Sequence, residues 1–254
     1  MGKVIGIVSL KGGVGKTSSV VSLGAALAEL GQNVLLVDAN FSSPTLGVHL
    51  NIIEPDITLN SVLNRKANIA DAIYSVGKFD VVPCSIFSGR KINPFNLRDK
   101  IRYLKKKYDF ILIDSSPALN DETLAAMMAS DEILVVTTPD YSTMGTTLNA
   151  IKHAKSRKTP ISGLILNKVY GKKFEISPEH VEKVAEIPVM AILPHDKRML
   201  EAQSKFMPIT HHKPSCELSQ EYMRLASCLS GQKNVPVTIK AILRRFNPQR
   251  QDIN

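Results

Sequence analysis

Short apolar runs rich in β-branched residues alternate along the chain with longer amphipathic stretches, and this alternation predicts a repeating strand–helix–strand order. Strands are expected over residues 3–9, 33–38, 79–84, 110–114, 132–137, 161–167 and 189–193. Helices are expected over residues 16–30, 58–64, 96–107, 122–129, 146–157, 178–185 and 217–229. Because the strands are apolar throughout, the pattern predicts a doubly wound α/β fold with a mostly parallel sheet and helices on both faces.

Ligands of such a sheet bind at one edge. The carboxyl ends of parallel strands, and the loops that follow them, meet there because right-handed crossovers return the chain to the same side. Two predicted strands end in an acid, Asp38 and Asp114, and the polar loop over residues 9–17 follows the first strand. We therefore expect one binding site that combines these three segments.

The composition narrows the class of protein. The chain has 254 residues, 44% hydrophobic and 22% charged, which suits one folded α/β domain. Cys84, Cys216 and Cys228 lie far apart with no Cys-x-x-Cys pair, which argues against a disulfide scaffold or a metal knuckle. Because no apolar run approaches the roughly 18 residues of a membrane span, and the first is too short for a signal peptide, we expect a cytoplasmic protein.

Positive charge exceeds negative charge. Lysine and arginine total 32 against 23 acids, a net charge of +9, which favours an anionic partner such as a nucleotide, phospholipid or nucleic acid. Basic residues gather within 100–107 and 152–158, where they form either a solvated face or a DNA footprint. A small polar stretch divides the chain into a folded domain, residues 1–230, and a linker with a short basic tail, residues 231–254.

The loop after the first predicted strand carries the clearest chemistry. It ends in Gly15-Lys16-Thr17, as phosphate-binding loops do, although Leu10 stands where the strict spacing asks for glycine. Glycines let backbone N–H groups crowd around phosphate oxygens, and the following helix directs its positive end at them. Lys16 is expected to neutralise the terminal phosphates. The residues expected to bind the nucleotide here are Gly12, Gly13, Val14, Gly15, Lys16, Thr17 and Ser18.

A magnesium site is expected beside this loop. Mg²⁺ prefers oxygen ligands and bridges the phosphates that the loop holds. Thr17 offers a hydroxyl, and Asp38 and Asp114 each end an apolar strand at the same edge. These three residues are the predicted metal ligands, and the fold is predicted to be that of a P-loop NTPase.

The run Lys11-Gly12-Gly13-Val14-Gly15-Lys16-Thr17, with a lysine at its start, resembles the deviant Walker A loop of the MinD/ParA family of ATPases, and is most similar to its archaeal MinD-like members. Segments 37–44 and 114–117 are similar to the family's two switches, and 166–168 and 193–196 to its adenine-side segments. The resemblance covers nearly all of residues 2–229. It implies an ATPase with ATP or ADP and Mg²⁺ as cofactors, and a homodimer that encloses the nucleotide.

The resemblance also implies individual roles. Lys11 would reach the phosphates of a nucleotide held by the partner subunit, although its spacing alone also fits a solvated lysine. Asn167 would hydrogen-bond the adenine edge, and Pro194 would pack on the base. The residues expected to take part in hydrolysis are Lys11, Lys16, Asp38 and Asn40.

Asn40 departs from the family pattern. Many members carry aspartate two residues after Asp38, and that carboxylate positions or activates the attacking water. An amide cannot accept a proton near neutral pH. We therefore expect hydrolysis to be slow, to rely on Asp38 or the substrate itself, or to be prevented.

The basic tail has the pattern of an amphipathic helix. At 100° per residue its apolar positions fall within an arc of about 100°, and its cations lie outside that arc. A helix of this kind either lies in the interface of an anionic membrane, as the similar tail of MinD-type members implies, or packs back on its own domain. The residues expected at the membrane are Ile239, Ile242, Leu243 and Phe246, with Lys240, Arg244 and Arg245.

Three functions remain open at this point. The first is a MinD-like ATPase that dimerises with Mg·ATP and attaches reversibly to the inner face of the cell membrane, where it positions cell-division or other machinery with an unidentified protein activator or cargo. The second is a ParA-like ATPase whose ATP dimer binds DNA through the basic faces. The third is a regulator or scaffold that holds its nucleotide and hydrolyses it slowly because of Asn40.

Overall fold

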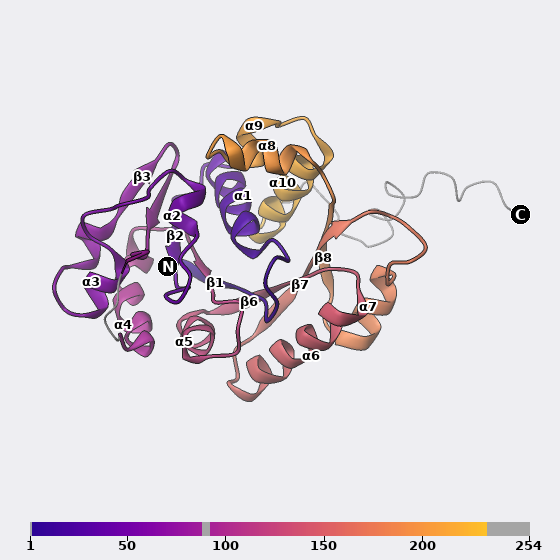
Figure 1. Ribbon diagram of the computed structural model, residues 1–254, viewed down its shortest axis with the longest axis horizontal. Helices are drawn as coiled ribbons and strands as arrows, with labels where there is room; N and C mark the ends of the chain where they lie inside the picture. Colours follow the sequence, from indigo (N-terminus) through magenta and orange to yellow (C-terminus); the bar gives the residue numbers. More distant parts are fainter. Residues whose placement is uncertain (1, 88–91, 233–254) are drawn as a thin grey trace, which may run out of the picture.

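The computed structural model describes residues 2–87 and 92–232, and its core is one eight-stranded sheet in the order β3-β4-β2-β5-β1-β6-β7-β8 (Figure 1). Every neighbouring pair is parallel except β3 with β4. The strands are β1 (Lys3–Val8), β2 (Val34–Asp38), β3 (Tyr74–Val76), β4 (Phe79–Val82), β5 (Phe110–Asp114), β6 (Glu132–Thr137), β7 (Ile161–Val169) and β8 (Val189–Pro194). The predicted doubly wound fold is confirmed.

Helices cover both faces of this sheet. In Figure 1, α1 (Lys16–Glu29), α8 (Arg198–Ser204), α9 (Ile209–His212) and α10 (Glu217–Leu229) lie above it, and α5 (Asp121–Ala129), α6 (Tyr141–Ser156) and α7 (Pro178–Ala185) lie below. The remaining short elements are α2 (Leu46–His49), α3 (Leu59–Leu63), η1 (Ile69–Ala72), η2 (Pro94–Asn96), α4 (Leu97–Arg102) and η3 (Leu104–Lys106). One apolar cluster fills the α1–α10 face and two fill the other.

Close packing of α1 on the sheet fixes the position of the loop that precedes it. α1 is buried along most of its length, and Gly24 allows it to approach β2, since a Cβ at that position would lie 2.5 Å from Leu36 Cδ2. The phosphate loop is therefore held between a buried strand, β1, and a helix packed firmly on the sheet. A support of this kind gives a binding site precise geometry.

The structure corrects several predicted elements. The helix expected over residues 96–107 is three short pieces, η2, α4 and η3. The helix expected from residue 146 begins at Tyr141, where the Asp140 side chain caps it by accepting from the Thr143 N–H at 2.8 Å. The sequence pattern also missed β3, which pairs with β4 across a tight turn in which Gly77 takes a φ of 61°.

Among the described residues, no helix is both long and apolar enough to cross a membrane. The predicted membrane residues, Ile239, Lys240, Ile242, Leu243, Arg244, Arg245 and Phe246, lie outside the described residues. The boundary near residue 230 stays a prediction.

Candidate functional site

The phosphate loop opens into a cavity of about 590 Å³, a volume that suits a small-molecule ligand. Gly13 and Gly15 take φ values of 77° and 92°, a conformation that L side chains adopt only at a cost. Gly15 is also the N-cap residue of α1 and supplies no side-chain cap, and the first turn of α1 contains no acid. The positive end of α1 is therefore available to an anion in the cavity.

Two strand-end acids lie beneath this loop, as predicted. Asp38 and Asp114 are paired positions on the neighbouring strands β2 and β5, and both are fully buried. Lys16 Nζ lies 2.6 Å from one carboxylate oxygen of Asp114, and the Thr17 hydroxyl donates to the other, also at 2.6 Å. The loop, α1 and two strands thus meet at one cluster of polar groups.

In the part of the chain that the structure describes, no lysine or arginine side chain forms an ion pair with Asp38. Its two oxygens accept from the backbone N–H groups of Asn40 and Leu46, each at 3.1 Å. Burial, together with the charge of Asp114, raises its pKa to about 7. Two buried carboxylates therefore share one lysine, an arrangement that a further cation would stabilise.

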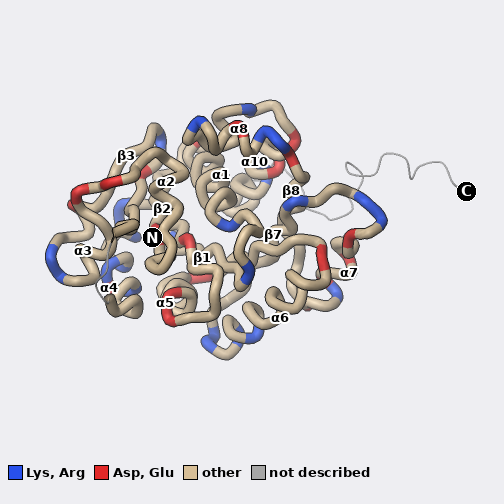
Figure 2. The backbone as a smooth tube through the Cα atoms, viewed as in Figure 1, with Lys and Arg blue, Asp and Glu red and all other residues tan. Residues whose placement is uncertain are grey.

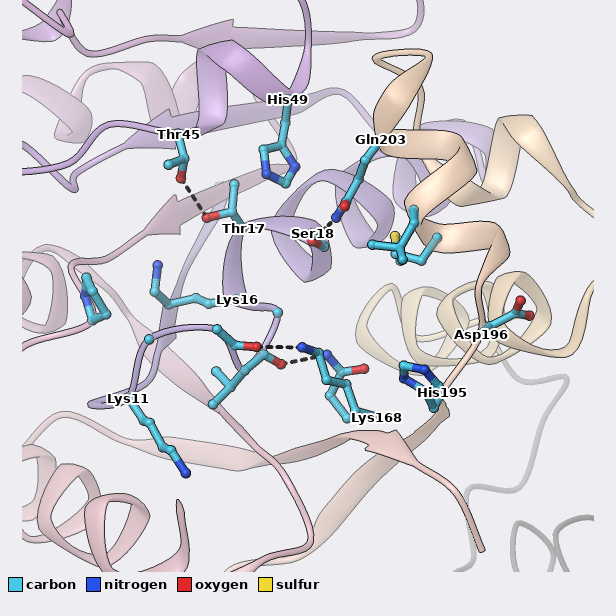
Figure 3. Close-up of a pocket in the computed structure, with 18 of the residues that line it drawn as sticks. Lys11, Lys16, Thr17, Ser18, Thr45, His49, Lys168, His195, Asp196 and Gln203 are labelled. Carbon is cyan, nitrogen blue, oxygen red and sulfur yellow. Dashed lines mark hydrogen bonds between the residues drawn. The ribbon is translucent and has the colours of Figure 1, made fainter. Parts of the chain in front are cut away.

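This donor set fits Mg²⁺ and its water ligands. Thr17 Oγ1 lies 3.1 Å from Thr45 Oγ1, and both hydroxyls line the cavity (Figure 3). The carboxylates of Asp114, which accepts from Thr17, and of Asp38 lie buried next to these hydroxyls. Asn40 is 4% exposed and lines the cavity, and its Oδ1 has no hydrogen-bond partner within the described part of the chain. A buried acceptor without a partner calls for a donor such as a bound water.

Lys11 lies at the rim of the cavity and is held within its own chain. Its ammonium donates to Thr143 Oγ1 at 2.7 Å and Ser142 Oγ at 3.2 Å, and lies 3.4 Å from Asp140 Oδ1. In Figure 3 the side chain of Lys11 points away from that of Lys16. The ammonium of Lys11 therefore contacts the first turn of α6 and its cap residue, and does not point at the phosphate site of its own chain.

The cavity lining also contains the two residues predicted to bind the base, Asn167 and Pro194. Asn167 Nδ2 donates to the Val14 carbonyl at 2.7 Å, which leaves its Oδ1 to accept from a ligand. Pro194 lines the same cavity, and next to it His195 stacks on Tyr170 with a ring separation of 4.4 Å. An amide acceptor beside an apolar surface suits an amino-bearing base.

Some lining residues were not predicted. Thr45 is the N-cap residue of α2, and His49 is the last residue of that helix. Gln203 comes from α8 and donates to Ser18 Oγ at 2.7 Å. Burial lowers the pKa of His49. These residues lie on or next to helices too short for a clear periodic signal, so the sequence pattern held no sign of their position.

Comparison with known proteins places the chain in a family. A family model described as an AAA domain matches residues 2–163. An uncharacterized ATP-binding protein of Methanocaldococcus jannaschii is 33% identical, with 93% of this chain and 90% of that protein covered. The crystal structure of the cell division ATPase MinD of Pyrococcus furiosus, 34% identical, aligns with a TM-score of 0.87 over 91% of this chain and 99% of that one. The chain belongs to the MinD/ParA family of ATPases.

This result confirms the predicted family and the predicted similarity to archaeal MinD-like members. A second MinD/ParA structure, the septum site-determining protein MinD of Pyrococcus horikoshii, aligns with a TM-score of 0.86 at 33% identity and covers 90% of this chain and 96% of that one. That protein is complexed with Mg-ADP, the kind of ligand that the sequence predicts.

Proposed function

We propose that this MinD/ParA-type ATPase binds Mg·ATP in the cavity above the phosphate loop and acts as a nucleotide-controlled switch that attaches reversibly to a membrane. The observation that carries the proposal is the buried cluster in which Lys16 and Thr17 both reach Asp114, with Asp38 beside it. A phosphate loop, a lysine and two strand-end carboxylates together suit a triphosphate with its metal. The similar MinD structures, one of them complexed with Mg-ADP, support the choice of a nucleotide with Mg²⁺ as the ligand.

Each residue then has a defined task. Bound Mg²⁺ would act as a Lewis acid toward the phosphate oxygens. Thr17, Asp38 and Asp114 hold the metal or its waters, and Lys16 moves from Asp114 toward the phosphates. The Oδ1 of Asn40, which has no hydrogen-bond partner among the described residues, can orient the attacking water but cannot take its proton, which makes hydrolysis slow. Asn167 and Pro194 bind adenine.

Lys11 links the nucleotide to dimerisation. A lysine at the cavity rim that leaves Thr143 and Ser142 reaches outward, toward a nucleotide in a second copy. A cation across the interface lets the triphosphate hold two subunits together, and loss of one phosphate weakens that contact. The homodimer is therefore the ATP state of the switch.

The tail, residues 231–254, provides the membrane contact in this proposal. One amphipathic helix of three turns binds an anionic surface weakly, with about 1 kcal/mol from each basic group near it. Two tails on one dimer bind far more strongly, because the second contact is intramolecular. ATP thus favours attachment to the inner face of the membrane, where the dimer positions cell-division or other machinery, and an unidentified partner completes the cycle.

DNA is the alternative to the membrane as the binding partner of the ATP-bound dimer. Figure 2 shows basic residues beside α4 and at one end of α6. Three of these lysines are engaged by acids: Lys105 by Asp131 at 2.8 Å, Lys107 by Asp80 at 3.7 Å and Lys155 by Glu186 at 3.6 Å. Because this pairing reduces the charge left for phosphates, we favour the membrane over a ParA-like role.

The deciding experiment is co-sedimentation of the full chain with anionic liposomes in ATP and in ADP. We expect ATP to drive binding and a chain that ends at Gly231 to remain in solution. Leu243→Asp, which puts a charge in the apolar stripe, should abolish binding, whereas Asn247→Asp adds the same charge outside the stripe and should not. If no form binds lipid in ATP, the membrane role is wrong, and salt-dependent DNA binding by the ATP form would replace it.

A further inference from the structure

β7 is irregular at the point where it meets the phosphate loop. Leu166 pairs with Ile192 and Val169 pairs with Pro194, so three steps along β7 match two steps along β8. The extra residue falls at Asn167 or Lys168, and Lys168 has a φ of 57°. Bulges of this kind turn side chains away from the regular alternation and are common beside functional sites.

As a consequence, two consecutive side chains reach the same loop. Asn167 Nδ2 donates to the Val14 carbonyl and Lys168 Nζ donates to the Gly13 carbonyl, both at 2.7 Å, and both bonds are drawn in Figure 3. In a regular strand these two side chains would point to opposite faces of the sheet. The left-handed conformation of Lys168 is costly for a side chain and is stabilised only by its surroundings.

The neighbouring contacts keep the bulge in place. The His195 N–H donates to the Val169 carbonyl at 2.9 Å, and the His195 ring stacks on Tyr170. Glu175 accepts from the backbone N–H of Tyr170 at 2.9 Å and from that of Lys172 at 3.0 Å. The backbone that follows Lys168 is therefore held in place by these contacts. The backbone position of Lys168 is fixed, so its side chain can hold the Gly13 carbonyl.

We propose that Lys168 is a positioning residue for the phosphate loop. A trans peptide is planar, and its C=O and N–H point in opposite directions. By holding the Gly13 carbonyl toward β7, Lys168 turns the Val14 N–H toward the phosphates, and Asn167 does the same for the Gly15 N–H through the Val14 carbonyl. This inference rests on the nucleotide binding proposed above and assigns Lys168 to the loop, not to the base.

The test compares two ligands on the full chain. Lys168→Met keeps the aliphatic stem and removes the ammonium. Affinity is measured by displacement of a fluorescent ADP with Mg·ADP and, separately, with inorganic tripolyphosphate, which has no base. We expect both affinities to fall by a similar factor, on the order of 10-fold, as for loss of a hydrogen bond from a charged donor. Lys168→Arg, which keeps a donor, should recover most of the loss.

Lys172→Met is the matched control, because it removes the same charge from an exposed lysine of the following loop. It should bind both ligands like the unaltered chain. A loss confined to ADP would mean that Lys168 contacts the base and would overturn the inference, as would unchanged affinity for both ligands. If the unaltered chain binds no ADP, the proposed function itself fails, which is a separate result. Equal melting temperatures would confirm that Lys168→Met retains the fold.

Discussion

Lys11 donates a hydrogen bond of 2.7 Å to the hydroxyl of Thr143, a residue 132 positions later in the chain. The same ammonium lies near Asp140, which caps α6. Burial raises the pKa of Asp140, but hydrogen bonds from Thr138 and Thr143 outweigh this effect and lower it to about 2, so the carboxylate is charged at any physiological pH. Lys11 must leave these groups before it can contact the nucleotide of a partner subunit.

Weakening this contact should therefore favour the dimer. Asp140→Asn removes the charge while Asn still caps α6 as well as Asp does. A part-exposed ion pair contributes at most about 1 kcal/mol, so with two subunits we expect the dimer dissociation constant to fall by a few-fold. Sedimentation velocity with a hydrolysis-resistant ATP analogue measures this change.

Lys11→Ala gives the opposite expectation for the same equilibrium. It removes the group that bridges to the partner, so the chain should stay monomeric with the ATP analogue while it still binds nucleotide. Dimers of Lys11→Ala as strong as those of the unaltered chain would contradict the bridging role. Weaker dimers of Asp140→Asn would show that Asp140 supports the interface.

Hydrophobic patterning was sufficient for the seven buried strands, because each is a largely apolar run, but not for β3, which is only partly buried. The phosphate loop and Asp114 were predictable for a related reason: their chemistry is local in sequence and follows directly from a strand. The start of α6 was not, since Tyr141–Gly145 contains poor helix formers and its only signal was the cap at Asp140. Tertiary packing decides such segments.

Some contacts between distant segments could not be predicted from the sequence. The bond from Lys168 to Gly13 joins residues 155 positions apart, and it depends on a bulge that no pattern of apolar residues announces. The contact of Lys11 with Thr143 of its own chain also joins residues far apart in the sequence. The sequence around a loop lysine does not show whether the lysine is solvated, bonded within its own chain or directed at a partner. Only its neighbours in space distinguish these roles.

Asp38 should make the stability of the nucleotide-free protein depend on pH. Its pKa is about 7 in the folded chain against 3.8 ordinarily, so between these values the folded state binds a proton that the unfolded state does not. The free energy of unfolding should therefore decrease as pH rises through this window, by a few kcal/mol at most. Thermal unfolding from pH 5 to pH 8 measures the slope.

Asp38→Asn provides the comparison for this slope. The lowered pKa of His49 has the opposite effect, since it makes stability rise with pH below the ordinary value of 6.5, and it is present in both proteins. The difference between the two proteins therefore isolates Asp38 from His49. Equal slopes would mean that Asp38 is ionised throughout. Adding Mg·ADP should flatten the slope of the unaltered chain, because a cation favours the carboxylate.

Gly15 has little room for a side chain. Its φ is 92°, and a Cβ there would lie 2.3 Å from Asn167 Nδ2. Gly15→Ala should therefore strain the loop and break the bond from Asn167 to Val14, at a cost of about 2 kcal/mol or more. Calorimetric titration should show ADP affinity reduced by at least about 10-fold. Gly145→Ala, with no atom within 4 Å of its added Cβ, should bind ADP normally.

We expect Asn40 to limit hydrolysis, because its Oδ1, unpartnered within residues 2–87 and 92–232, can orient a water but cannot take its proton. Asn40→Asp restores a base at a site that is 4% exposed, close to Asp38, and should raise phosphate release at saturating Mg·ATP, by up to about 100-fold. KM should change little, because the phosphates are held by the loop. Since Asp38 and burial both raise the pKa of the new carboxyl group, the rate should increase with pH. Asn40→Ala, which lacks an acceptor, should be no faster than the unaltered chain; an Asn40→Asp chain that is equally slow would show that water activation lies elsewhere.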